Sequence, residues 1–389
     1  MEQFPAVIIG GPPDSGKSVL TANLTQALRE RGVAHYVLRA CPDGEGDWSH
    51  LADQEQVRTL VVPRQWTPSF VEHVCRDLER RHLPLIVDVG GRPQPWQEAI
   101  FGHCTHAILL TKDEDSHHAW LDRVTSHGLI LLADLRSELE GESVLADRRP
   151  VLRGTIAGLE RGVRLESTLF EALVERLTGI FAYDAEKLRQ VHLDATPVET
   201  SIDLDRLART LHIPHRKERA VWEPRHLPQV LDYLPQAISL GAYGRGPNWL
   251  YAALALLAAP STFVQFDPRL GWVEARSLRL AAPEPSAPLQ FQIHERLERE
   301  RRHPYTHLKG LLPTAYVDYS QIDSLVTPPI RTGTGVVLSG QLPHWLTTSL
   351  ALTYRTAPWI AVYQPQLEGA AVVYSADQTQ PVGNLLSLH

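Results

Sequence analysis

Gly244-Arg245-Gly246-Pro247-Asn248-Trp249-Leu250 is the stretch that decides how the second half of this chain is organised, because it occurs twice. Gly340-Gln341-Leu342-Pro343-His344-Trp345-Leu346 repeats its glycine, proline, tryptophan and leucine at the same relative positions. Residues 244–257 and 340–353 agree at seven of fourteen positions. An agreement of this length predicts a duplicated structural unit.

The pattern around each copy predicts the same order of elements: strand, glycine loop, helix, strand, turn and strand. The first strand is expected at residues 237–241 and 336–339, and the last near residues 272–275 and 370–374. The sequence therefore predicts two tandem α/β units, over residues 226–282 and 283–389.

The glycine loops are the first candidate binding features. A loop that runs from a strand into a helix presents free backbone N–H groups to an anion such as phosphate. Arg245 lies in the first loop, and Asp267 and Arg269 follow the next strand, which would place all three at one edge of a parallel sheet. A purely structural explanation also exists, in which the glycines make a tight turn, Pro247 starts the helix and Trp249 packs in the core. The candidate ligand-binding residues of the loops are Gly244, Gly246, Asn248 and Gly340.

The two motifs together resemble a known family. Gly244-Arg245-Gly246-Pro247-Asn248-Trp249 and Phe266-Asp267-Pro268-Arg269-Leu270-Gly271 are similar to the Csx-three family of CRISPR-associated ring nucleases, which bind and cleave cyclic tetra-adenylate. The resemblance covers about residues 226–389 and leaves the first half of the chain unexplained. It implies that the ring is opened by a ribose 2′-hydroxyl, with Arg245 and Arg269 stabilising the developing charge and Asp267 acting as acid, base or orienting group.

The second copy departs from the family pattern. Gln341, Gln364 and Gln366 replace the two arginines and the aspartate of the first copy. Histidines that family members carry are also absent, because Ala258, Ala259 and Thr356 stand at the matching places. His344 in the second loop is a candidate catalytic residue, and the alternative explanation is a surface histidine at a helix start.

The first half of the chain carries a different motif. Gly11-Pro12-Pro13-Asp14-Ser15-Gly16-Lys17-Ser18 has the spacing of a phosphate-binding P-loop and stands between an apolar strand and a helix expected at residues 19–31. Lys17 would reach the phosphates of ATP and Ser18 would ligate Mg²⁺, with Mn²⁺ as a possible substitute. Asp88, at the end of the apolar run before Gly90-Gly91, would share that metal ion, or would simply end a strand. The candidate ATP-binding residues are Gly11, Asp14, Ser15, Gly16, Lys17, Ser18 and Asp88.

Alternating strands and helices around this motif predict a doubly wound α/β P-loop NTPase or kinase-like domain over residues 1–182. Residues 183–225 are expected to be a linker, and the charged run at 295–302 an exposed helix. Asp43 or Asp47 is a further candidate for orienting a water or accepting a substrate proton.

Composition limits the classes of protein to which this chain can belong. Of 389 residues, 43% are hydrophobic and 21% charged, which is ordinary for a globular protein, and the net charge of −7 argues against long nucleic acid as a partner. Cys41, Cys75 and Cys104 have no metal-binding spacing and favour a reducing cytoplasm. We find no signal segment or membrane-spanning run, so a cytoplasmic location is expected. Two units per chain predict a homodimer or higher homo-oligomer.

Three functions remain open from the sequence. The first is a ring nuclease for cyclic tetra-adenylate, a phosphodiesterase of antiviral defence, coupled to an ATPase or kinase domain. The second is a ring sensor that binds but does not cut and controls the ATP-binding domain. The third is a nucleotide-dependent assembly protein in which both halves serve oligomerisation.

Overall fold

The computed structural model describes residues 4–41, 67–216, 219–297, 304–314 and 316–388. Asp43 and Asp47 lie outside these ranges. The chain divides near residue 188 into two compact units, and the short segment Pro268–Gly271 belongs with the first of them. Each contains parallel strand pairs and helices, which confirms the predicted mixed α/β class. No helix within the described ranges combines the length and apolarity that crossing a membrane requires.

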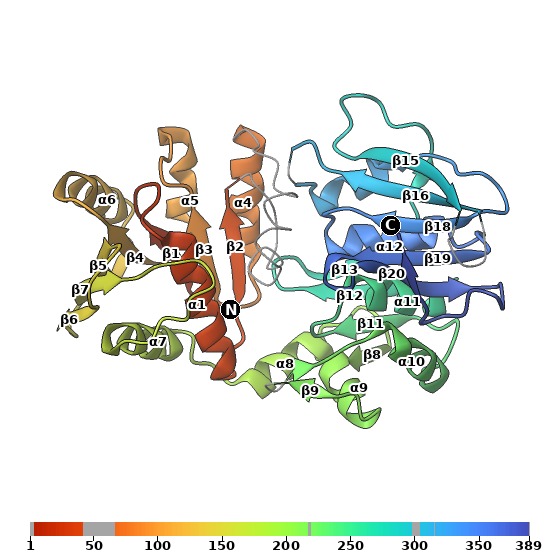
Figure 1. The fold of residues 1–389 in the computed structure, drawn as a ribbon, viewed down its shortest axis with the longest axis horizontal. Helices are drawn as coiled ribbons and strands as arrows, with labels where there is room; N and C mark the ends of the chain where they lie inside the picture. Colours follow the sequence, from red (N-terminus) through yellow and green to blue (C-terminus); the bar gives the residue numbers. More distant parts are fainter. Residues whose placement is uncertain (1–3, 42–66, 217–218, 298–303, 315, 389) are drawn as a thin grey trace. The chain divides into compact units, whose positions relative to one another are not determined.

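The first unit is built on one sheet with the strand order β2-β3-β1-β4-β5-β7-β6 (Figure 1). All neighbouring strands pair in parallel except β6, which runs antiparallel to β7. Strands β1 and β3 are buried at every residue, as expected of central parallel strands. The strands are β1 (Ala6–Gly10), β2 (Tyr36–Ala40), β3 (Leu85–Val89), β4 (His106–Thr111), β5 (Ile130–Glu138), β6 (Val144–Asp147) and β7 (Leu152–Ala157).

Helices cover both faces of this sheet (Figure 1). The apolar sides of α1 (Lys17–Glu30) and α7 (Thr168–Ile180) share one core with alternate residues of the strands. The opposite face carries α4 (Pro68–Arg80), α5 (Ala99–Gly102) and α6 (Glu114–Ser126), the side that right-handed crossovers require for these connections. This arrangement places the carboxyl ends of β1, β3 and β4 side by side.

The second unit begins with helices and a four-stranded sheet in the order β13-β12-β11-β8. Strand β8 pairs in parallel with β11, so the segment expected to be a linker supplies a strand of this sheet. Its four residues, Thr-Ser-Ile-Asp, are too few and too polar to show the alternation of apolar and polar residues that predicts a strand. The sequence therefore predicted a linker here instead of a strand. The elements are α8 (Ala185–Asp194), β8 (Thr200–Asp203), α9 (Leu204–Thr210), α10 (Leu227–Tyr233), β11 (Leu240–Tyr243), α11 (Asn248–Ala258), β12 (Phe263–Asp267) and β13 (Gly271–Glu274).

A six-stranded sheet, β15-β16-β18-β19-β20-β21, completes the second unit. Residues 295–297 belong to strand β15, which pairs antiparallel with β16, so the helix expected from residue 295 onward is wrong where the structure describes it. The elements are β15 (Gln290–Leu297), β16 (Pro304–Leu311), β18 (Gly335–Ser339), α12 (His344–Thr353), β19 (Trp359–Gln364), β20 (Gly369–Ser375) and β21 (Leu385–Ser387). Two short ladders join β9 (His215–Arg216) to β10 (Arg219–Ala220) and β14 (Arg279–Leu280) to β17 (Val326–Thr327).

The two repeated stretches follow one plan. Strand β11 lies between parallel neighbours β8 and β12, and β18 lies in the same way between β16 and β19. In both, a glycine with positive φ follows the first strand, and a proline then occupies the N-cap position of the helix, α11 or α12. Helices α11 and α12 pack against each other, and Trp249 and Trp345 are each only 1% exposed. The matching tryptophans therefore anchor the two helices in the interior.

Gly340 supports the first stability prediction. Its φ is +128°, and a β-carbon there would lie 2.3 Å from the backbone oxygen of Gly310 on β16. Gly340→Ala is expected to lower the free energy of unfolding by about 2 kcal/mol or more, from backbone strain plus the clash. Gly333→Ala is the control, because Gly333 has φ +77° but nothing lies within 4 Å of the added β-carbon. This control is expected to lower the free energy of unfolding by about 1 kcal/mol. If chemical denaturation gives equal losses of unfolding free energy for the two variants, Gly340 does not approach the backbone of Gly310 as closely as described.

Candidate functional site

The loop Gly11–Ser18 joins the buried strand β1 to helix α1 at the carboxyl edge of the first sheet. Asp14 and Gly16 have φ values of +56° and +86°, which turn the loop back on itself before the helix. No side chain caps the first turn of α1, and that turn contains no acidic residue. Its backbone N–H groups and the positive end of the helix are therefore available to an anion.

Lys17, Ser18 and Asp88 meet at this loop. Asp88 is the last residue but one of β3, the strand next to β1, and is only 2% exposed. The hydroxyl of Ser18 donates to Asp88 Oδ2 at 3.2 Å. Burial lowers the pKa of Lys17, whereas Asp88 acts in the opposite direction, and the Lys17 ammonium donates to the carbonyl of Pro12 at 2.6 Å. The three residues therefore lie together at the carboxyl edge of the sheet.

Two further features fit a phosphate group at the loop. The hydroxyl of Ser15 is buried and has no hydrogen-bond partner among the described residues, so a ligand oxygen would satisfy it. Gly91, just beyond β3, approaches so closely that a β-carbon would lie 2.4 Å from the nitrogen of Pro13. The segment after β3 therefore packs so closely against the loop that there is no space for a side chain at position 91.

The glycine loop of the first repeat lies at the carboxyl end of β11. Gly244 has φ +107°, and its carbonyl accepts a hydrogen bond from the hydroxyl of Tyr251 on α11. Asn248 begins the helix, and its side-chain oxygen Oδ1 is buried with no hydrogen-bond partner in the described part of the chain. A buried acceptor of this kind is ready for a donor from a ligand.

Tyr251 is the centre of a charged cluster. Burial is the main cause that raises its pKa, and Asp267, Arg245 and Asp205 are all close enough to act on the same group. The ring of His344, which starts α12 in the second repeat, lies edge-on to the ring of Tyr251 with centroids 5.2 Å apart. Two predicted site residues, Arg245 and Asp267, therefore act electrostatically on a side chain that the sequence did not single out, and a third, His344, contacts its ring.

Asp205 adds to the charge balance of this cluster. Burial and the neighbouring Asp203 raise the pKa of Asp205, while Arg189, Arg209 and Arg245 oppose that shift. Arg189 Nη2 lies 3.7 Å from Asp205 Oδ2, so positive charge reaches this carboxylate in a chain whose net charge is −7. We name this group Tyr251, Asp205, Arg245, Asp267 and His344 the composite cluster, because both repeats contribute to it.

Arg269 occupies a different environment. It is only 6% exposed, and its guanidinium Nη1 lies 3.2 Å from Asp77 Oδ2 on α4, within the first unit. The guanidinium also stands 5.6 Å from the ring of Tyr36. A buried guanidinium requires such a carboxylate, and Asp77 supplies it for Arg269 within the first unit.

The glycine loop of the second repeat is less charged. Gln364, the counterpart of Asp267, has a buried side-chain oxygen without a partner among the residues described. Beside the loop, His307 Nε2 lies 2.8 Å from the hydroxyl of Ser339, the residue before Gly340. Burial lowers the pKa of His307 from 6.5 to about 4, and Arg296, His294 and Lys309 act in the same direction. The second loop therefore offers neutral hydrogen-bonding groups rather than paired charges.

The low pKa of His307 predicts acid sensitivity. Between pH 6.5 and about 4 the unfolded chain binds a proton at this histidine that the folded chain does not bind. The stability that His307 contributes is therefore fully present above pH 6.5, and the free energy of unfolding decreases as the pH falls through this range. His307→Gln keeps a hydrogen-bonding side chain and removes the titration. We expect the free energy of unfolding to fall less between pH 7.5 and 5 in the variant than in the unchanged protein. Parallel pH profiles would contradict the prediction, because they would mean that the pKa of His307 is the same in the folded and unfolded chain.

Sequence reasoning missed Tyr251, Asp205 and the pair His307 and Ser339. In the sequence Tyr251 is one of several large residues of an apolar helix, and no motif indicates a role for its hydroxyl. Asp205 lies in the segment expected to be a linker. A signal did exist for Ser339, because it precedes Gly340 as Tyr243 precedes Gly244.

Comparison with known protein families bears on the second repeat. Residues 311–387 match the family model described as CRISPR-associated protein (Cas_csx3). The match begins at the last residue of β16 and takes in β18, α12, β19, β20 and β21. The predicted resemblance to the Csx-three family is therefore confirmed for this part of the chain, which carries a CRISPR-associated Csx-three domain.

Proposed function

We propose that the second unit binds cyclic tetra-adenylate and cleaves it at the composite cluster, and that the Gly11–Ser18 loop binds ATP. The observation that carries this proposal is the gathering of Arg245, Asp267 and His344 around Tyr251. A guanidinium, a carboxylate and an imidazole are the groups that phosphodiester cleavage requires. The tandem α/β units and their joint site are part of the same proposal.

The reaction proposed is internal transesterification. A ribose 2′-oxygen forms a bond to the adjacent phosphorus, the bond from phosphorus to the 5′-oxygen breaks, and the products end in a 2′,3′-cyclic phosphate and a 5′-hydroxyl. Asp267 accepts the proton of the 2′-hydroxyl, and His344 supplies one to the leaving 5′-oxygen. Arg245 stabilises the negative charge that develops on the phosphate oxygens.

Unpaired acceptors at both loops support recognition of a nucleotide. The buried oxygens of Asn248 and Gln364 have no hydrogen-bond partner among the described residues. Ribose hydroxyls or base amino groups would satisfy them. The loops also present backbone N–H groups at the starts of α11 and α12, which suits phosphates on the same ligand.

Equilibrium binding tests this proposal before any rate is measured. Titration calorimetry of cyclic tetra-adenylate is expected to give saturable binding, weakened about tenfold or more in Arg245→Gln, because a charge-assisted phosphate contact is lost. Gln341→Ala is the matched control at the corresponding position of the second loop, and binding there is expected to change less. Absence of binding to the unchanged protein would reject the proposal.

The P-loop half is proposed to act with ATP and Mg²⁺. Lys17 would contact the phosphates, and Ser18 and Asp88 would hold the metal ion, which neutralises charge on the phosphates when bound. The fit rests on the Ser18–Asp88 hydrogen bond and the unpartnered hydroxyl of Ser15. Either hydrolysis or transfer of a phosphoryl group to another substrate is compatible with these residues.

The second candidate function is a sensor that binds the ring without cutting it. It is favoured by the glutamines at positions 341, 364 and 366, which remove the charges of the first copy. In that case the ring changes ATP turnover and remains intact. Measuring ATP turnover with and without cyclic tetra-adenylate, and recovering the ring afterwards, separates the two functions. A homodimer would bring four glycine loops to one ligand, and light scattering with and without the ring tests that number.

A further inference from the structure

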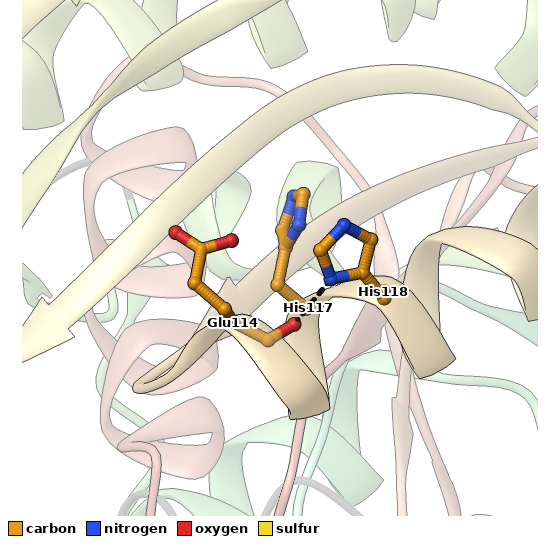
Figure 2. A group of neighbouring side chains, drawn as sticks. All are labelled: Glu114, His117 and His118. Carbon is orange, nitrogen blue, oxygen red and sulfur yellow. Dashed lines mark hydrogen bonds between the residues drawn. The ribbon is translucent and has the colours of Figure 1, made fainter.

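Helix α6 carries a cluster that neither motif includes. Glu114, His117 and His118 lie at positions i, i+3 and i+4 in its first turns, and one ligand atom from each lies within 4.8 Å of the other two. Figure 2 shows the three side chains rising from the same stretch of the helix. We propose that these residues form a binding site for a divalent transition metal ion, most simply Zn²⁺.

The hydrogen bonds of the two histidines fix which nitrogen is free to bind a metal. His117 Nε2 lies 3.0 Å from Asp134 Oδ1 on β5, and a carboxylate can only accept, so Nε2 carries the proton. The lone pair of the neutral ring is then on Nδ1, which is buried and has no hydrogen-bond partner among the described residues. That unpartnered nitrogen is explained if it binds a metal ion.

His118 is oriented in the same way by a different acceptor. Its Nδ1 lies 2.8 Å from the carbonyl oxygen of Glu114, as the dashed line in Figure 2 shows, so Nδ1 donates and Nε2 keeps the lone pair. The carboxylate of Glu114 supplies the third ligand. Three ligands of this kind would leave a coordination position open, as in catalytic zinc sites.

Asp134 completes the arrangement as a residue that positions a ligand. A carboxylate bonded to the far nitrogen of a metal-binding histidine holds the ring and increases its basicity. Arg153 Nε lies 3.8 Å from Asp134 Oδ2 and keeps part of that charge balanced. The nitrogen-rich ligand set favours Zn²⁺ over Mg²⁺, which prefers oxygen ligands.

A pocket beside the cluster suggests what occupies the open position. It has a volume of about 150 Å³ and is lined by Thr111, Lys112, Asp113, Glu114, His117, Asp134, Arg136 and Gly154. Lys112 and Arg136 bring positive charge to it. An anion or a water would therefore be the fourth ligand, held between the metal ion and these basic side chains.

Binding of Zn²⁺ to the full chain, measured against a chromophoric chelator, tests the site directly. We expect one equivalent of tight binding that His117→Ala and His118→Ala each abolish, while Asp134→Asn weakens it about 10- to 100-fold. His127→Ala is the control, because His127 caps the same helix at its other end and pairs with Glu98. A spectrum of bound Co²⁺ provides a second readout, and its intense tetrahedral bands are expected to disappear with His117→Ala.

Opposite results would overturn the inference. If the unchanged protein binds no Zn²⁺ tightly, or if the three variants retain the same stoichiometry and affinity as His127→Ala, the cluster is not a metal site. Asp88→Asn separates this site from the P-loop, because it removes a metal ligand proposed for ATP but should leave Zn²⁺ binding on α6 unchanged.

Discussion

Asp267→Asn is expected to slow cleavage of cyclic tetra-adenylate about 100- to 10,000-fold, because the amide cannot accept the proton of the attacking 2′-hydroxyl. Asp267 ends β12 and is among the charges that act on Tyr251, so it lies within the composite cluster. The measurement is the single-turnover rate at saturating protein, which reports the chemical step without product release. Binding of the intact ring is expected to survive, because asparagine retains the size and most hydrogen bonds of aspartate.

Gln364→Ala provides the matched control for this prediction. It removes the side chain at the corresponding position of the second repeat, where no titratable group stands. A small effect is expected, mainly on binding, since the Gln364 oxygen is a buried acceptor rather than a base. Equal losses of rate in the two variants would mean that Asp267 has no role as acid or base.

Lys17→Met is expected to reduce ATP turnover by about 100-fold or more, because it removes the positive charge nearest the phosphates. The variant should remain folded. Burial already opposes the charged form of Lys17, and Asp88 keeps the hydrogen bond from Ser18, so an apolar side chain of similar length is expected to be tolerated. Thermal unfolding measured beside ATP turnover separates loss of function from loss of fold.

Lys187→Met is the control for the loss of a lysine as such, since Lys187 is exposed on α8. Its ATP turnover is expected to match that of the unchanged protein. If Lys17→Met and Lys187→Met turn over ATP at the same rate, the Gly11–Ser18 loop is not where ATP reacts. Ring cleavage by Lys17→Met also shows whether the second unit works without ATP.

Strong local patterns allowed the central elements to be predicted. Strand β4 (His106–Thr111) is an example, because residues 107–111 are apolar or β-forming and polar residues stand on either side of them. The starts of α6 and α7 are capped by Asp113 and Ser167, a signal visible in the sequence. The repeat itself revealed the positions of β18 and α12 within a few residues.

Other elements depend on tertiary structure. The charged sequence around Glu295 favours a helix, but pairing with β16 outweighs that preference over the described residues. Strand β6 is mostly exposed and has no apolar alternation. The candidate site residues also differ in how far the sequence predicts them. Residues within the Gly11–Ser18 motif could be predicted, whereas the charges that act on Tyr251 and the ion pair of Arg269 with Asp77 arise only when distant segments fold together.

The central claim is that the second unit opens cyclic tetra-adenylate, and chromatographic identification of the products tests it most directly. The purified protein is incubated with the ring, with and without ATP and divalent metal, beside Asp267→Asn. The account predicts linear adenylates ending in a 2′,3′-cyclic phosphate, formed by the unchanged protein and nearly absent with the variant. Recovery of only the intact ring under every condition would contradict cleavage and leave a sensor at most.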